Sequence, residues 1–414
     1  MISRFYNYLQ GVRSNLWFTP ALFSLVFFAI TLTSYFLETK YLSENFNLPS
    51  LFFDIGVEDA KDISLSLLGS TITLATLAIS VTMVALSLAA SQLGPRLIKV
   101  FMADKRTKAL IGVFFGVVFA CFTLTLILHT SNEAEYKYQI TINLVFMFCF
   151  IDLFVLLAFI NHVAKSCIAD NVVLDVKREL ESAIRRLAEN APKVNKKSCP
   201  KKKDWEAHFE DNTASLYFED CGYIQNVDYD KIVKIAKDKS LYINVLHEAG
   251  DYIFKGQECL KISPENMLED DTREALKNAF IIDNVRTATQ DLEYSVRHMV
   301  EIAIRALSPG INDSFTAANV VDHLSGALSI LLRQDFRVEW KSCPNEETFI
   351  HIKSKSEEEI LISAFDKIRD SASNTPFVLQ KTVDNLSILL TLSDEAEQKK
   401  TIKSQIKLLK DNLK

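Results

Sequence analysis

A row of hydroxyl side chains runs through an apolar stretch at residues 63–90 and could coordinate ions. Its members are Ser66, Thr73, Thr76, Ser80, Ser87 and Ser91. Four of them recur every seven residues, a spacing that stays on one face of a slightly supercoiled helix. Because hydroxyls can replace part of an ion's water shell, the pattern predicts a pore-lining helix. Small and hydroxyl residues also let membrane helices approach closely, so helix packing is the alternative interpretation.

Apolar and basic side chains accompany this stripe toward its carboxyl end. Leu77 and Val84 each follow a stripe residue by about one turn, and a ring of either could gate a pore by dewetting. The Gly-Pro pair at 94–95 should break the helix, because proline lacks an amide donor and clashes one turn back. Gln92 and Arg96 would then lie at the inner mouth. Alternatively, Arg96 is an ordinary anchor that contacts lipid phosphates.

One acidic residue, Asp152, falls in the middle of another apolar stretch. An unpaired carboxylate at that depth costs about 2.5–3.5 kcal/mol on insertion scales. The side chain must therefore be protonated, paired or hydrated. An interhelical hydrogen bond, with a hydroxyl of the stripe or Asn143 as donor, is one interpretation. An ion or proton site is the other.

A fourth candidate is the turn in the segment ALSPGIND, which contains Ser308, Gly310, Asn312 and Asp313. The Ser-Pro-Gly sequence ends one helix, and Asn312 or Asp313 can cap the next by accepting its free amides. Free amides at a helix start can also bind an anion or anionic ligand. The sequence leaves both interpretations open.

Catalytic and metal-binding patterns are not found in the 414 residues. The spacings of nucleotide-binding loops, serine hydrolases, kinases and zinc sites do not occur, so no enzyme activity, cofactor or metal is predicted. The seven cysteines include no CxxC pair, and a disulfide framework is not expected. A net charge of −6 and the lack of aromatic interleaving in basic segments argue against nucleic-acid binding.

Four apolar stretches are long enough to cross a bilayer, which needs about 20 helical residues. They cover residues 16–37, 63–90, 109–128 and 140–160. The segments before the first stretch, after the second and after the fourth are rich in Lys and Arg, whereas the loop at 38–62 is acidic. The positive-inside rule therefore predicts that both termini are cytoplasmic.

The remainder is charged and reads as a soluble body. Strands are predicted at 214–218, 222–227, 241–246 and 258–262, with a short helix capped by Asp228. The rhythm of residues 249–262 resembles the hairpins of barrel-sandwich domains of the biotinyl and lipoyl kind, although the lysine that those carriers modify is missing.

From residue 271 onward the pattern is mainly helical. One long helix is expected over 272–307, with Glu293, Arg297, Glu301 and Arg305 forming an i,i+4 ladder of ion pairs. A Lys-rich amphipathic helix is expected over 394–413.

Together these patterns predict an α-helical membrane protein with four transmembrane helices and a C-terminal cytoplasmic α+β domain. The expected boundaries are 1–165 for the four-span domain, 166–204 for a juxtamembrane helix and Lys-rich linker, 205–265 for a small β-rich, barrel-sandwich-like module, and 266–414 for a mainly helical domain.

Several long motifs are similar to those of the bacterial family catalogued as domain of unknown function 2254, predicted integral membrane proteins. They are LWFTPAL at 16–22, TITLATLAISVTMVALSLAASQLGPRLIKVFMADKRT at 71–107, INHVAKS at 160–166, GYIQNVDYDKIVKIA at 222–236 and RALSPGINDSFTA at 305–317. The resemblance implies four spans in the bacterial inner membrane and no established activity. Family members typically have proline where this chain has Ser314.

Three functions fit the sequence. The first is a homo-oligomeric channel for inorganic ions in the lipid bilayer, with a cytoplasmic domain that assembles the ring. The second is a membrane-anchored scaffold or signalling module, in which the stripe only packs helices. The third is a transporter that uses Asp152 for proton coupling.

Overall fold

The computed structural model describes residues 17–41, 55–94, 104–130, 138–166, 168–190, 202–210, 212–333, 340–342, 349–353 and 355–413. The chain divides into two compact units, unit 1 at residues 1–171 and unit 2 at residues 172–414. Each unit has hydrophobic clusters of its own.

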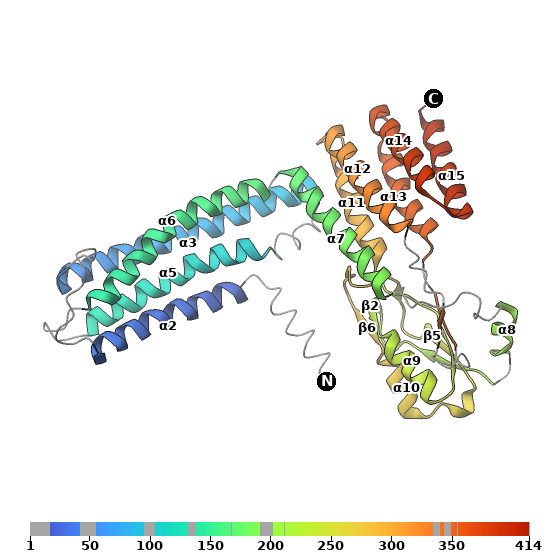
Figure 1. Cartoon of the computed structure of the whole chain (residues 1–414), viewed down its shortest axis with the longest axis horizontal. Helices are drawn as coiled ribbons and strands as arrows, with labels where there is room; N and C mark the ends of the chain where they lie inside the picture. Colours follow the sequence, from blue (N-terminus) through green and yellow to red (C-terminus); the bar gives the residue numbers. More distant parts are fainter. Residues whose placement is uncertain are drawn as a thin grey trace. The chain divides into compact units, whose positions relative to one another are not determined.

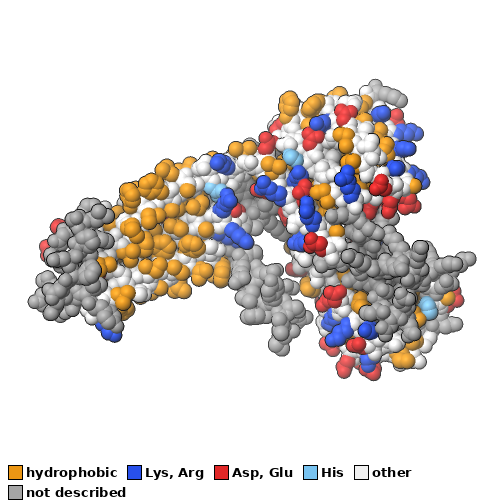
Figure 2. Space-filling view, viewed as in Figure 1, with side chains coloured by type: hydrophobic (Ala, Val, Ile, Leu, Met, Phe, Trp, Pro, Cys, Tyr) orange, Lys and Arg blue, Asp and Glu red, His pale blue; other side chains and the backbone are white. Residues whose placement is uncertain are grey.

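Unit 1 is built from four long helices, each long and apolar enough to cross a membrane. They are α2 (Phe18–Tyr41), α3 (Val57–Leu93), α5 (Lys105–Thr130) and α6 (Gln139–Ser166). These helices confirm the four apolar stretches predicted from the sequence. Helix α5 contacts each of the other three (Figure 1) and is the most buried. Hydrophobic side chains cover most of the visible flank of this unit, as membrane lipid requires (Figure 2).

Two glycines let α5 approach α2 closely. A Cβ placed on Gly116 would lie 2.7 Å from Cδ2 of Phe27, and one on Gly112 would lie 3.0 Å from Cγ of Phe23. The Phe27 ring is held from its other side by Phe148, at 4.9 Å between ring centroids. Small residues four apart are a usual device for close packing of membrane helices.

At one end of unit 1, a carboxylate from α2 caps α6. The first amides of a helix have no partner within it. Glu38 supplies one, accepting hydrogen bonds from the backbone amides of Ile140 and Thr141 at 2.8 and 3.0 Å. It also accepts one from the Thr141 hydroxyl at 2.8 Å. The side chain of Gln139 bonds both backbone groups of Ile55, just before α3.

At the opposite end, Asp104 performs the same task for α5. Its carboxylate accepts from the amides of Arg106 and Thr107, both at 3.1 Å. One of its oxygens also lies 2.6 Å from Nε2 of His162 on α6. Polar contacts therefore join α6 to α2 at one end of unit 1 and to the start of α5 at the other.

Helix α3 stops where the sequence predicts a break. Its last residue is Leu93, and Gly94 follows with φ +121°, in the region that favours glycine. Arg96 lies outside the described residues.

Unit 2 contains two small sheets. Their strands are β1 (Ala214–Tyr217), β2 (Gly222–Val227), β3 (Tyr242–Val245), β4 (Tyr252–Ile253), β5 (Glu258–Ser263), β6 (Phe280–Asp283), β7 (Trp340–Ser342) and β8 (Phe349–Ile352). The five-stranded sheet has the order β1-β5-β3-β8-β7 and the three-stranded sheet the order β4-β2-β6. Strands β3 and β8 pair in parallel, and the other pairs are antiparallel. The predicted strands are confirmed as β1, β2, β3 and β5.

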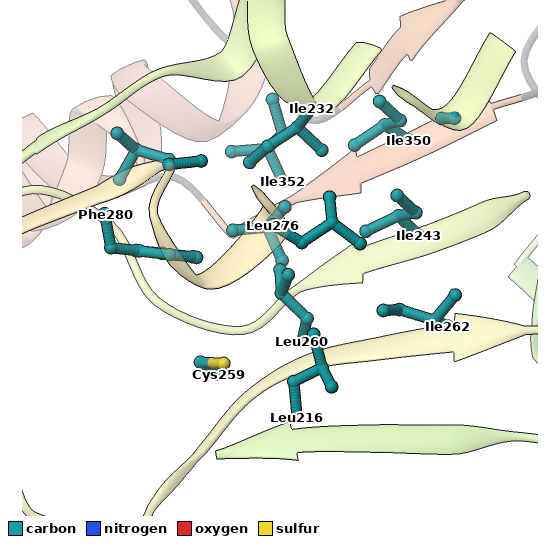
Figure 3. Close-up of a cluster of buried hydrophobic side chains, with 14 of the residues drawn as sticks. Leu216, Ile232, Ile243, Cys259, Leu260, Ile262, Leu276, Phe280, Ile350 and Ile352 are labelled. Atoms are coloured by element: carbon teal, nitrogen blue, oxygen red, sulfur yellow. The ribbon is translucent and has the colours of Figure 1, made fainter. Parts of the chain in front are cut away.

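Inward side chains of these strands and of neighbouring helices form one apolar cluster (Figure 3). Ile243, Leu260 and Ile262 are fully buried in it. Helix α9 (Tyr229–Asp238) contributes Ile232, and its start is capped as predicted, because Asp228 accepts from the amide of Lys231 at 3.0 Å.

The remaining elements of unit 2 are mostly helical. They are α7 (Ala169–Asn190), whose first three residues belong to unit 1, α8 (Lys202–Ala207), the 3₁₀ turn η1 (Glu265–Met267), α10 (Asp270–Lys277), α11 (Leu292–Ala306), α12 (Ser314–Leu331), α13 (Glu357–Ser371), α14 (Pro376–Leu392) and α15 (Ala396–Asn412). Helix α11 packs on α12 and α13, and α14 packs on α12 and α15. The predicted C-terminal amphipathic helix is confirmed as α15.

The prediction of one long helix over 272–307 is wrong. Helix α10 ends at Lys277, β6 follows and pairs with β2, and α11 starts at Leu292. The run Phe280-Ile281-Ile282 is aromatic and β-branched, which suits a strand. Because the residues before and after this run have helical spacing, the sequence pattern did not indicate the strand β6. Strands β6, β7 and β8 also lie beyond residue 265, where the predicted β-rich module ends, and the domain boundaries stay a prediction.

Replacing Gly116 with alanine should loosen unit 1, because the added methyl meets a Phe27 ring that cannot easily move. We expect Gly116→Ala to lower the free energy of unfolding by about 1–3 kcal/mol, seen as a lower melting temperature in detergent. Gly69→Ala on α3 is the control, since a Cβ there meets nothing within 4 Å. Equal melting temperatures for the two variants would contradict this packing.

Candidate functional site

The hydroxyl stripe of α3 points away from the other three helices. Ser66, Thr73, Thr76, Ser80, Ser87 and Ser91 are all exposed on unit 1. The hydroxyls of Thr73, Thr76 and Ser80 donate to backbone carbonyls four residues earlier, at 2.8–2.9 Å. Each hydroxyl hydrogen is therefore used in a bond within the helix, and the oxygen presents its acceptor lone pairs outward.

The opposite face of α3 makes the contacts within the chain. Ala75, Ala78, Ala85 and Ala89 are at most 8% exposed, and the first three join a cluster with Phe114 and Phe159. The predicted alternative, that the stripe packs helices, does not hold inside this unit, because alanines do this. Their spacing of three, seven and four residues is a helical pattern that the sequence carries but that the hydroxyl pattern obscured.

The two candidate gate residues share the outward face. Leu77 is 49% and Val84 is 69% exposed on unit 1. Neither takes part in the packing of α3 on α5 or α6. For the inner mouth, the side chain of Gln92 and the whole of Arg96 lie outside the described residues.

Asp152 lies inside unit 1, midway along α6. Its side chain is fully buried, and neither carboxylate oxygen has a hydrogen-bond partner among the described residues. The predicted hydrogen bond from Asn143 is not made, since that amide donates to the backbone carbonyl of Gln139 at 2.7 Å. The stripe hydroxyls cannot reach Asp152 because they face outward.

In the turn before α12, the carboxylate of Asp313 occupies the position at the helix start where an external anion could bind. Asp313 caps α12, accepting from the Thr316 amide at 3.0 Å and the Thr316 hydroxyl at 2.6 Å, and these bonds lower the pKa of Asp313. Asn312 has φ +50°, and the Ser308 hydroxyl donates to the carbonyl of Arg305. Gly310 is exposed. The cap is confirmed, and an external ligand at this turn stays a prediction.

A buried ionic cluster in unit 2 was not predicted. Arg286 lies 2.6 Å from Asp291 and 3.2 Å from Glu293, which in turn lies 2.9 Å from Lys355. Lys355 also lies 3.7 Å from Glu248. The cluster joins a loop between sheet strands, the start of α11 and the segment before α13. The Glu293–Arg297 pair, at 2.6 Å, belongs to the predicted i,i+4 ladder and joins it to this cluster.

Backbone shape makes room for this cluster. Gly250 has φ +96°, and a Cβ there would collide with the carboxylate of Asp291. Asp291 also caps α11 by accepting from the amide of Tyr294 at 3.0 Å. Gly250 precedes Arg286 by 36 residues and Asp291 by 41 residues, so sequence spacing alone gave no signal that the loop contacts the start of α11.

Two glutamates of this cluster differ in pKa, although burial acts on both in the same direction. Burial raises the pKa of Glu248 to about 7, from an ordinary value of 4.5, despite the nearby Lys355. For Glu293 burial acts in the same direction, but hydrogen bonds and charge from Lys355 and Arg297 outweigh it and bring the pKa to about 2. One carboxyl of the cluster is thus held neutral in weak acid while its neighbour stays charged.

Four membrane-length apolar helices followed by an α+β body define the chain as a predicted membrane protein. It belongs to the family described as "Predicted membrane protein (DUF2254)", which matches residues 13–387. The resemblance seen in the sequence is therefore confirmed.

Similar curated proteins carry no assigned activity. Uncharacterized proteins of Mycobacterium bovis and Mycobacterium tuberculosis are each 25% identical to this chain over 383 residues. The alignment covers 87% of this chain and 70% of each relative. No solved structure matches the chain.

The raised pKa of Glu248 predicts a pH-dependent stability of unit 2. Between pH 4.5 and about 7 the folded protein holds a proton that the unfolded chain releases, so stability should fall as pH rises through this window. The total loss should be at most about 3 kcal/mol. Glu248→Gln should abolish it, as followed by tryptophan fluorescence during chemical denaturation of the full chain. Exposed Glu274 offers the control Glu274→Gln, and an unchanged slope in Glu248→Gln would contradict the assignment.

Proposed function

We propose that this protein is a homo-oligomeric ion channel of the bacterial inner membrane, with α3 of each copy lining a central pore. Unit 2 is its cytoplasmic assembly or regulatory domain, and both termini are cytoplasmic. The observation that carries the proposal is the outward hydroxyl face of α3, which none of the other described helices of unit 1 covers.

The outward faces of the other helices differ from that of α3. On α6 the exposed side chains include Phe150, Phe154 and Leu157, and on α2 they include Leu25 and Phe36. Such faces suit lipid tails. In the described part of α2 only Thr33 places an exposed hydroxyl midway along the helix. A face with six hydroxyls has little to gain from lipid, so contact with other copies or with water explains it better.

The direction of the hydroxyl groups favours cations. Because Thr73, Thr76 and Ser80 donate to their own backbone, their oxygens are left as acceptors. A ring of such acceptors can replace water around a cation. The acidic loop at 38–62 would concentrate cations at the outer side.

The same face contains apolar residues that could close the pore. Leu77 and Val84 alternate with the hydroxyls along α3 and are exposed on unit 1. Rings of these side chains would form constrictions that empty of water when narrow. The Lys and Arg distribution supports a cytoplasmic position for the carboxyl end of α3.

A scaffold without conduction is the second candidate. The hydroxyl groups of Thr73, Thr76 and Ser80 already donate to backbone carbonyls of α3 and need no further partner. Copies of the chain could therefore pack along α3 with no water between them. Particle symmetry separates the two functions. A ring with α3 innermost around an opening supports the channel, whereas a pair with the α3 faces pressed together supports the scaffold.

Reconstituted wild-type protein should give discrete, cation-selective currents in planar bilayers. Thr76→Val should reduce them, because it removes an acceptor from the pore wall. Leu77→Ser and Val84→Ser should raise the current, by on the order of tenfold if the wetting barrier falls by about 1.4 kcal/mol. Single-channel recording measures both effects.

Thr33→Val on α2 provides a matched control. That hydroxyl is also exposed and also donates to a carbonyl four residues earlier, at 2.7 Å. It should leave conductance unchanged, since α2 faces lipid. Currents that are absent in wild type, or equally altered by Thr33→Val and Thr76→Val, would overturn the pore assignment.

A further inference from the structure

A small polar layer lies inside unit 1 at the level where one apolar cluster gives way to another. One cluster contains Ala60 of α3, Val117, Ala120, Cys121, Leu124 and Leu128 of α5, Tyr138 just before α6, and Ile142 and Val145 of α6. The other contains Ala75, Ala78 and Ala85 of α3, Ile111 and Phe114 of α5, and Phe159 and Val163 of α6. Thr71 of α3 and Asp152 of α6 are buried between the two clusters along their helices, and the layer also includes Cys121, a buried member of the first cluster, and half-buried Cys149 of α6.

The members of this layer lie close together. The two sulfur atoms of Cys121 and Cys149 are 3.4 Å apart, and Asp152 is near enough to interact electrostatically with both thiols. Thr71 contacts Cys121 and donates its hydroxyl proton to the carbonyl of Leu68 at 3.1 Å. The layer thus offers Asp152 neither a positive charge nor a hydrogen bond within the described residues.

The charged groups of the four helices stand elsewhere. On α2, Glu38 is occupied by the start of α6. On α3, the acids and Lys61 fall in the first two turns. On α5, the basic residues occupy the first turn and His129 the last, and on α6 His162 contacts Asp104. The thiols of Cys121 and Cys149 are therefore the titratable groups that face Asp152 in the described part of unit 1.

We propose that Asp152, which is buried close to the thiols of Cys121 and Cys149, is a proton-binding site in the middle of the membrane-spanning unit. A carboxylate without a partner cannot remain charged between two apolar clusters, so it must hold a cation. This site does not depend on α3 lining a pore.

The neighbours of Asp152 select the proton over a metal ion. Hard cations such as sodium, magnesium or calcium need several oxygen ligands. Apart from the carboxylate itself, the layer has one hydroxyl, and thiols are ligands for soft metals. No set of three His, Cys, Asp or Glu side chains among the described residues is arranged to hold a metal ion. A proton needs only the carboxylate.

Release of that proton would place a charge between the two clusters. Helices α3, α5 and α6 would then have to admit water at the polar layer. Protonation of Asp152 is thus linked to close packing of α3 on its neighbours, through the same helix whose other face carries the hydroxyl stripe.

A lipophilic carbodiimide tests the site, because it reacts with protonated carboxyl groups in apolar surroundings. The full chain in lipid vesicles is treated with dicyclohexylcarbodiimide at mildly acidic to mildly alkaline pH, and modified peptides are mapped by mass spectrometry. We expect modification at Asp152 that declines as pH rises and is unaffected by sodium or lithium. Asp152→Asn should lose this label, and Asp152→Glu should retain it.

Exposed Glu58, in the first turn of α3, is the internal control. The lipophilic reagent should leave it unmodified, whereas a water-soluble carbodiimide should modify Glu58 and spare Asp152. Absence of label at Asp152 in acid, labelling that ignores pH, or protection by sodium would each overturn the proposal. Because the label is mapped on the wild-type chain, the result does not require any variant to fold.

Discussion

A helix in a membrane must satisfy each of its polar groups without help from lipid, and α3 meets this constraint with two unlike faces. Its alanines lie against α5 and α6, where small side chains allow close approach. Its hydroxyls lie on the other side, bonded to their own backbone. This division fits the arrangement of unit 1, in which α3 presents its alanine face to α5, the helix that contacts the other three.

Unit 2 obeys the related rule that buried charges are paired. Arg286 and Lys355 are surrounded by Asp291, Glu293 and Glu248, and these five residues come from three separate segments of the chain. Gly250 lets the strand loop approach Asp291 without a side chain in the way. The cluster ties the sheets to the helices α11 and α13 through charge, while the apolar cluster of the sheets holds their interior.

Features that depend on local sequence were predictable. Continuous apolar runs revealed the four long helices, Asp228 and Asp313 revealed caps, and Gly94 revealed the end of α3. Features that depend on partners distant in sequence were not. Strand β6 exists because β2 offers it an edge, and its three apolar residues look no different from part of a helix. Asp152 was recognisable as unusual, but the sequence could not show that α3 turns its hydroxyls away and that no described residue bonds the carboxylate.

The cap that Glu38 provides for α6 also bears on how the protein is made. The carboxylate belongs to α2, whereas the amides that donate to it belong to α6, which emerges later during synthesis. Until α6 is inserted, Glu38 has only water or headgroups to satisfy it, and it must stay near the bilayer surface. The polar end of α2 therefore gains its protein partner only when α6 is inserted, so the packing of α2 is completed last.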